Sequence, residues 1–148
     1  MRKLILTVAL LLSAHTYSQT LCIEANFKNL EEQNVDATDN FNFLTDDIVD
    51  ACDFTLGASQ CSKAYIYKNR MDSVLETNKE MTTDLKNLLN KWDQVYESCV
   101  GNRQSRAADG FNTVVRMYNK LVVEDSEHNN QIAACMAKIA KLTKFCNN

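Results

Sequence analysis

The sequence predicts an all-α protein: a four- to five-helix antiparallel bundle with one long central helix, stapled by three disulfides. Three observations support this prediction. The 148 residues include no proline and only three glycines, whereas proteins built from strands need frequent turns rich in those residues. Apolar residues recur at spacings of three and four, which is the period of a helix with one buried face. Six cysteines in so short a chain predict a disulfide framework.

The first residues predict a secretory signal peptide over 1–18. Arg2 and Lys3 make the start positive, an apolar run broken only by Thr7 follows over 4–12, and the sequence then turns polar up to a cleavage position after Ser18. The apolar run is under half of the roughly 20 residues that a membrane-spanning helix needs. We therefore expect a secreted, extracellular chain without a membrane span, in which residues 19–148 form a single helical domain.

A long helix is predicted over 62–100. At a rise of 1.5 Å per residue it would be roughly 55 Å long. Only Asn78 is polar among the eleven positions that define its buried face, and a polar residue there either fixes the register of the bundle or faces a gap between helices. These positions alternate at three and four residues: Ala64, Tyr67, Met71, Val74, Asn78, Met81, Leu85, Leu88, Trp92, Val95 and Cys99.

Shorter apolar seams predict the remaining helices. A loop at 54–60 that contains Gly57 and breaks at 101–105 and 124–127 separate most of them. Short links make neighbouring helices antiparallel. In chain order the predicted helices are a short leading helix through 23–30, one near 39–54, a third through 108–122 and a last one through 132–146.

The cysteines favour three disulfides over a zinc site, because no two lie two to four residues apart and only one histidine follows the signal peptide. Six cysteines allow fifteen connectivities. Helix lengths favour one of them: Cys52 with Cys61 across the first loop, Cys99 with Cys146 after two antiparallel returns, and Cys22 with Cys135 by elimination.

Charge excludes one class of partner. Removing Arg2 and Lys3 leaves 14 Lys and Arg against 19 Asp and Glu, a net charge of −5. An acidic total argues against nucleic acid, whose phosphates require a basic footprint. Acids gather in 19–53 and bases in 101–148; either the acidic arm folds back near the basic end or both are solvated faces.

The sequence contains few residues in patterns typical of catalytic sites, so we expect that the protein is not an enzyme and binds no cofactor and no metal. His128 is the only histidine after the signal peptide, and no serine lies in a G-x-S-x-G turn. We expect His128 at a solvent-exposed helix start, beside the acidic residues Glu124, Asp125 and Glu127.

Two sets of residues could serve binding instead. Methionine and aromatic side chains of the long helix could line a cavity for a small hydrophobic ligand, or simply fill a bundle core; they are Tyr67, Met71, Met81, Trp92 and Tyr96. A basic strip could contact an acidic partner, or be an ordinary solvated face; it comprises Arg116, Lys120, Lys138, Lys141 and Lys144.

The signal peptide, the length and the six cysteines loosely resemble small secreted helical proteins of insects: odorant-binding proteins and related proteins of saliva and gut. That resemblance implies bridged helices around an apolar cavity, or salivary effectors that bind host mediators or proteins. The cysteine spacing departs from the odorant-binding pattern. Cys52 and Cys61 lie nine residues apart instead of about one turn, and Cys99 and Cys135 are 36 apart.

We therefore expect a secreted, non-enzymatic binding or effector protein that acts extracellularly on another protein. By resemblance, it would be a salivary, venom or gut effector that modulates a host immune or haemostatic target. The alternative is a carrier of a small hydrophobic ligand in the bundle core.

Overall fold

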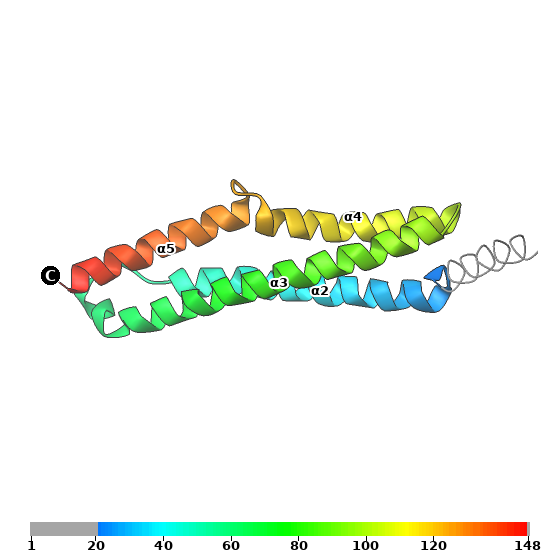
Figure 1. Cartoon of the computed structure of the whole chain (residues 1–148). Helices are drawn as coiled ribbons and strands as arrows, with labels where there is room; N and C mark the ends of the chain where they lie inside the picture. Colours follow the sequence, from blue (N-terminus) through cyan, green and yellow to red (C-terminus); the bar gives the residue numbers. More distant parts are fainter. Residues whose placement is uncertain (1–20, 148) are drawn as a thin grey trace, which may run out of the picture. The chain divides into compact units, whose positions relative to one another are not determined.

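The computed structural model describes residues 21–147, and these residues are all-α (Figure 1). The predicted signal peptide over 1–18 lies outside the described residues. No β-strand occurs within 21–147. The elements are α2 (Glu24–Cys52), the 3₁₀ helix η1 (Ala58–Lys63), α3 (Ala64–Ser98), α4 (Asn102–Val122) and α5 (Glu127–Cys146).

The predicted leading helix and the predicted helix near 39–54 are one continuous helix, α2. The apolar seam of α2 is interrupted by Asn34 and Thr38, which is why the sequence reads as two segments. Both polar side chains are bonded in the fold: the Nδ2 of Asn34 donates to the carbonyl of Gly110, and Thr38 Oγ1 donates to the sulfur of Met117. Helix α2 therefore tolerates polar residues on its inner face because partners satisfy them.

The predicted long helix is confirmed as α3, with 35 residues. It ends just before a short link in which Gly101 has a φ of 59°, a left-handed conformation that glycine adopts without steric cost. Helix α5 begins after Ser126, whose side chain accepts a hydrogen bond from the backbone N–H of Asn129. A serine in this position satisfies one of the free N–H groups at a helix start.

The chain divides into two compact units, and α2, α3 and α4 each contribute residues to both. Within the described residues, unit 1 comprises 21–35 and 87–115, and unit 2 comprises 36–86 and 116–147.

The core of unit 1 is built around Trp92, whose side chain is fully buried. The indole Nε1 donates a hydrogen bond of 2.8 Å to Asn34 Oδ1. The Nδ2 of Asn34 in turn donates to the backbone carbonyl of Gly110 at 3.2 Å. Phe27, also fully buried, packs on the indole with ring centroids 6.2 Å apart. One buried polar chain thus links α2, α3 and α4.

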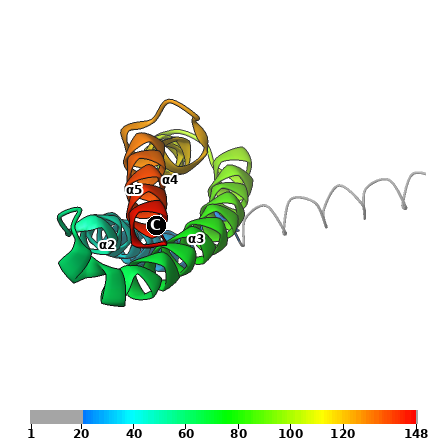
Figure 2. The same ribbon diagram turned by 90° about the vertical axis from the view of Figure 1, so that its left-hand side faces the viewer.

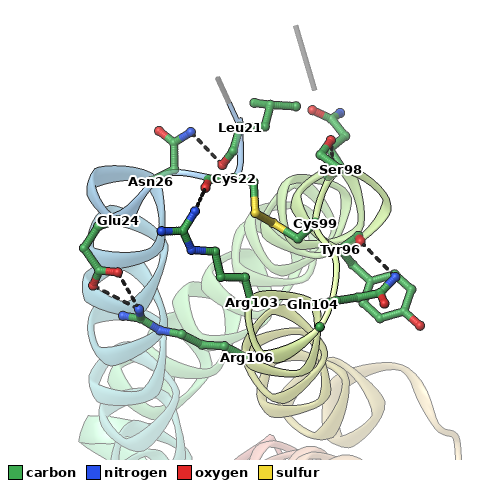
Figure 3. Close-up of a disulfide and its surroundings, with 12 residues drawn as sticks. Leu21, Cys22, Glu24, Asn26, Tyr96, Ser98, Cys99, Arg103, Gln104 and Arg106 are labelled. Atoms are coloured by element: carbon green, nitrogen blue, oxygen red, sulfur yellow. Dashed lines mark hydrogen bonds and ion pairs between the residues drawn. A yellow bond between two sulfur atoms is a disulfide. The ribbon is translucent and has the colours of Figure 1, made fainter. Parts of the chain in front are cut away.

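A disulfide between Cys22 and Cys99 closes one end of unit 1, and Arg103 donates a hydrogen bond to the Cys22 carbonyl beside it (Figure 3). Arg106, one turn further along α4, pairs with Glu24 at 2.9 Å and with Glu31 at 2.7 Å. The hydrogen bond from Arg106 lowers the pKa of Glu31, and the two carboxylates raise the pKa of Arg106. The guanidinium also lies 4.8 Å from the centroid of the Phe27 ring, so Arg106 covers the apolar core while its charge is neutralised.

Two disulfides hold unit 2: Cys52 with Cys135, and Cys61 with Cys146. Figure 2 shows the last turn of α5, in red, at the same end of the unit as η1 and the first turns of α3. Cys61 and Cys146 are 5.3 Å apart between Cα atoms, so α5 runs antiparallel to the beginning of α3.

All three predicted disulfide pairs are wrong. The prediction assumed that the link before α5 returns the chain to Cys99, at the end of α3. Cys61 and Cys99 flank the two ends of α3, which at 35 residues is about 52 Å long. Because Cys146 bonds to Cys61, α5 ends at the beginning of α3 instead, which leaves Cys99 for Cys22 and Cys135 for Cys52.

Close packing at Gly110 gives a first testable prediction. A Cβ added there would lie 2.5 Å from the indole ring of Trp92, and this fully buried ring has no room to move. We expect Gly110→Ala to lower the free energy of unfolding, because overpacking costs about 1–3 kcal/mol and the better helix propensity of alanine offsets only about 1 kcal/mol. Denaturant unfolding measures the difference. Gly57→Ala is the control, since a Cβ at Gly57 meets nothing within 4 Å; a Gly110→Ala variant as stable as the parent protein would contradict the packing described.

Candidate binding groove

Unit 2 carries an apolar groove between α3 and α5, which we call the α3/α5 groove. Its volume is about 460 Å³, within the range of roughly 300–1,000 Å³ seen for ligand sites. It is lined by Lys68, Met71, Asp72, Leu75, Met136, Ile139, Ala140, Thr143, Lys144 and Asn147.

The floor of the α3/α5 groove is the edge of the hydrophobic core. Met71 and Ile139 are buried and form its base, whereas Met136 is 48% exposed at its side. Ala140 is exposed as well, and its single methyl group leaves open the space that a larger side chain would fill. An apolar surface of this kind, set into the protein, is typical of a binding site.

The antiparallel course of α3 and α5 gives the α3/α5 groove two different ends. The Cys61–Cys146 bridge places Lys68, early in α3, at the same end as Lys144, late in α5. Leu75 and Met136 lie towards the other end. The groove is therefore cationic at one end and apolar at the other.

Charges around the cationic end are only partly neutralised. Lys68 pairs with Asp72 at 2.7 Å, one turn along α3, and both side chains are well exposed; such a surface pair contributes little stability. Lys144 lies in the last turn of α5, where a cation interacts favourably with the helix dipole. The side chains at this end carry a net positive charge.

A second groove, of about 380 Å³, lies on the opposite side of α5 and includes Ala134 and Lys138 in its lining. The Lys138 ammonium donates a 2.7 Å hydrogen bond to the carbonyl of Cys52, the last residue of α2, and lies 4.5 Å from the centroid of the Phe54 ring. A lysine so placed satisfies a free carbonyl at a helix end. Lys138 is thus half-buried and held by the protein itself.

The structure does not collect the predicted basic strip around one groove. Lys144 lines the α3/α5 groove, and Lys138 lines the second groove. Lys120 is exposed, with its ammonium 5.2 Å from the centroid of the Phe41 ring. Arg116 and Lys141 are exposed. A partner-binding role for these five residues remains a prediction.

The five predicted ligand-binding residues do not lie together in one cavity. Met71 lines the α3/α5 groove, and Met81 is buried in unit 2. Tyr67 stacks on Phe54 with ring centroids 4.3 Å apart and donates a hydrogen bond to Gln60. Trp92 is enclosed in the core of unit 1, and Tyr96, also in unit 1, is 41% exposed. Their ligand-binding role remains a prediction.

His128 is buried, with 4% of its surface exposed, so its expected place in a solvent-exposed turn is wrong. Its Nε2 lies 2.9 Å from Asn78 Oδ1, and its ring centroid is 5.5 Å from that of Phe41. Although His128 is the second residue of α5, its side chain points into unit 2 and pairs with the polar position of the long helix. Burial lowers the pKa of His128, and the charge of Lys120 lowers it further.

Sequence reasoning did not single out Asn34 or Met136. A signal for Asn34 existed, because a buried tryptophan usually finds a hydrogen-bond acceptor for its indole N–H and Asn34 continues the seam of Phe27 and Leu30. No such signal existed for Met136. It lies one position beyond the seam residue Cys135, and only the placement of α5 against α3 brings it to the groove.

Comparisons of the chain with known proteins found no matching protein-family model, curated protein or solved structure. Across residues 21–147, no helix has the length and apolar character needed to cross a membrane. The same residues contain no cluster of three or more histidine, cysteine or acidic side chains arranged to hold a metal ion.

The buried histidine predicts a pH-dependent stability. In the unfolded chain His128 titrates near its ordinary value of 6.5, whereas the folded protein holds its pKa lower. Between these two values the unfolded chain binds more protons, so the free energy of unfolding should fall as the pH drops below about 7, by at most about 1.4 kcal/mol per pH unit for one group. Above that pH the titration of His128 should add no further pH dependence to the free energy of unfolding.

Denaturant unfolding between pH 5 and pH 8 measures this effect, with His128→Gln as the comparison. Glutamine retains a polar group for Asn78 and does not titrate. The free energy of unfolding of the His128→Gln variant should therefore change less between pH 5 and pH 8 than that of the parent protein. Glu31 does not interfere, because its pKa is lowered from an ordinary value of 4.5 and its contribution is lost only below that pH. Parallel curves for the two proteins would contradict the role of His128.

Proposed function

We propose that the protein is a secreted, non-enzymatic binding or effector protein that acts outside the cell by contacting another protein. In this proposal residues 1–18 are a cleaved signal peptide and the mature chain is one antiparallel bundle of four to five helices around α3. The three disulfides support an extracellular location, because such bridges form and persist in oxidising compartments. A salivary, venom or gut effector with an immune or haemostatic target is the form of this proposal that follows from the resemblance to insect secreted proteins.

The observation that carries the proposal is the α3/α5 groove. Its apolar floor is open on the surface of unit 2, where a side chain of a partner can reach the exposed Met136. The residues Met81 and Trp92, by contrast, are packed within the protein. An exposed apolar groove together with packed interior side chains suits contact with a protein more than enclosure of a ligand.

Photo-crosslinking tests this proposal. Benzoylphenylalanine at position 140, in the α3/α5 groove, should capture a protein when the variant is irradiated in the fluid into which the protein is secreted. The same group at position 134 is a matched control, because Ala134 lies on the other side of the same helix, in the second groove. We expect a specific protein adduct from position 140 and not from 134; no adduct from position 140 would argue against a protein partner at this groove.

A second candidate function is the carrier of a small hydrophobic ligand, which the volume and apolar lining of the same groove favour. Native mass spectrometry of the protein from its own secretion, without reduction, separates the two. A carrier should have the mass of residues 19–148, less six hydrogens, plus a small adduct. The bare mass would remove the carrier and leave the protein-binding proposal in place.

A further inference from the structure

We propose that the partner segment recognised by the α3/α5 groove is an amphipathic helix with a carboxylate at one end of its apolar face. This inference rests on the proposed function and adds the chemistry of the partner. It is carried by the two different ends of the groove and by the identity of the side chains along it.

The apolar part of the groove fits the face of a helix. Met136 is 48% exposed on the α5 wall, and methionine adapts its shape to varied apolar side chains. The α5 wall runs from Met136 to Asn147, about 16 Å at the helical rise of 1.5 Å per residue. A bound helix that inserts side chains at positions i, i+4 and i+7 needs about 10 Å, so three such anchors fit along this wall.

The cationic end selects the charge of the partner. Lys68 of α3 and Lys144 of α5 lie at this end, one on each wall of the groove, and Asp72 neutralises Lys68. The helix dipoles add little to this charge. The N-terminus of α3 carries a partial positive charge, the C-terminus of α5 carries a partial negative charge, and the two lie at the same end of the groove. A carboxylate is therefore attracted to Lys144, whereas a cation at that position is repelled, and such complementarity sets specificity and the rate of association.

The orientation of the bound helix follows from the same two ends. Its apolar anchors lie towards Leu75 and Met136, and its acidic residue lies about two turns away, beside Lys144. A peptide with the same composition but with the acidic residue at the other end of its apolar face should bind more weakly.

Selection from a display library of helical peptides, on the mature disulfide-bonded protein, tests this inference. The expected result is enrichment of apolar residues at i, i+3 or i+4, and i+7, with Asp or Glu at one end. Enrichment of Lys or Arg at that end, or no enrichment at all, would overturn it.

Variants then locate the site of an enriched peptide, with binding measured by fluorescence anisotropy. Lys144→Glu should weaken binding about fivefold or more, and a new selection on this variant should enrich basic residues in place of acidic ones. Lys86→Glu is the control, because Lys86 is exposed on α3 in the same unit, does not line the groove and is not part of the basic strip. Equal losses from both variants would point to a general effect of charge and would overturn the inference.

A steric variant tests the apolar part separately. Ala140→Trp fills the α3/α5 groove and should reduce binding at least about tenfold, whereas Ala134→Trp places the same side chain in the second groove and should have little effect. Circular dichroism and melting of both variants establish that they remain folded. Binding that survives Ala140→Trp in a folded protein places the peptide elsewhere.

Failure of this inference can be separated from failure of the proposed function. If crosslinking from position 140 captures a protein but no acidic amphipathic peptide is enriched, the partner binds the groove through other chemistry. If neither experiment yields a protein or peptide, the proposed function fails as well.

Discussion

The bridge between Cys61 and Cys146 is the constraint on which the candidate site depends. It joins Cys61, in η1 three residues before α3 begins, to Cys146, the last residue of α5, and so sets the register in which the two helices pass each other. Shifting α5 by one turn would move each of its side chains about 5.4 Å along α3. The position of Lys144 along the groove relative to Lys68 would then change, and so would that of Met136 relative to Leu75. The covalent bond therefore determines where the groove is charged and where it is apolar.

Buried polar groups complement the disulfides in specifying how the helices pack. In unit 1, Asn34 uses both ends of its amide, accepting from Trp92 and donating to Gly110. In unit 2, the buried His128 near the start of α5 pairs with the half-buried Asn78 of α3. A buried polar group that loses its partner costs about 1–3 kcal/mol, so packing arrangements that separate these pairs are disfavoured. Apolar side chains alone would tolerate more alternatives, because dispersion contacts are not directional.

The sequence predicted the helices well and the relations between them poorly, for a physical reason. A helix is a local structure with a fixed period, so the seam from Ala64 to Cys99 was enough to predict α3. The pairing of cysteines depends on the direction of each link, which no periodicity encodes. The prediction assumed a bridge across the first loop and the wrong direction for the link before α5, and all three pairs were wrong. The charged neighbours of His128 suggested an exposed turn, yet its own side chain faces inward while theirs do not. The α3/α5 groove could not be predicted either, since it exists only where Met136 and Ala140 pass α3.

The order of the bridges has a consequence for the lifetime of the molecule. In chain order the first cysteine bonds the fourth, the second bonds the fifth and the third bonds the sixth. Every peptide bond between Cys22 and Cys146 is therefore spanned by at least one bridge, and those between Cys61 and Cys99 are spanned by all three. A protease that cuts once anywhere in this interval produces two fragments that stay covalently joined. In a fluid rich in proteases, a nicked molecule keeps its helices tethered and loses its pieces only when it is also reduced.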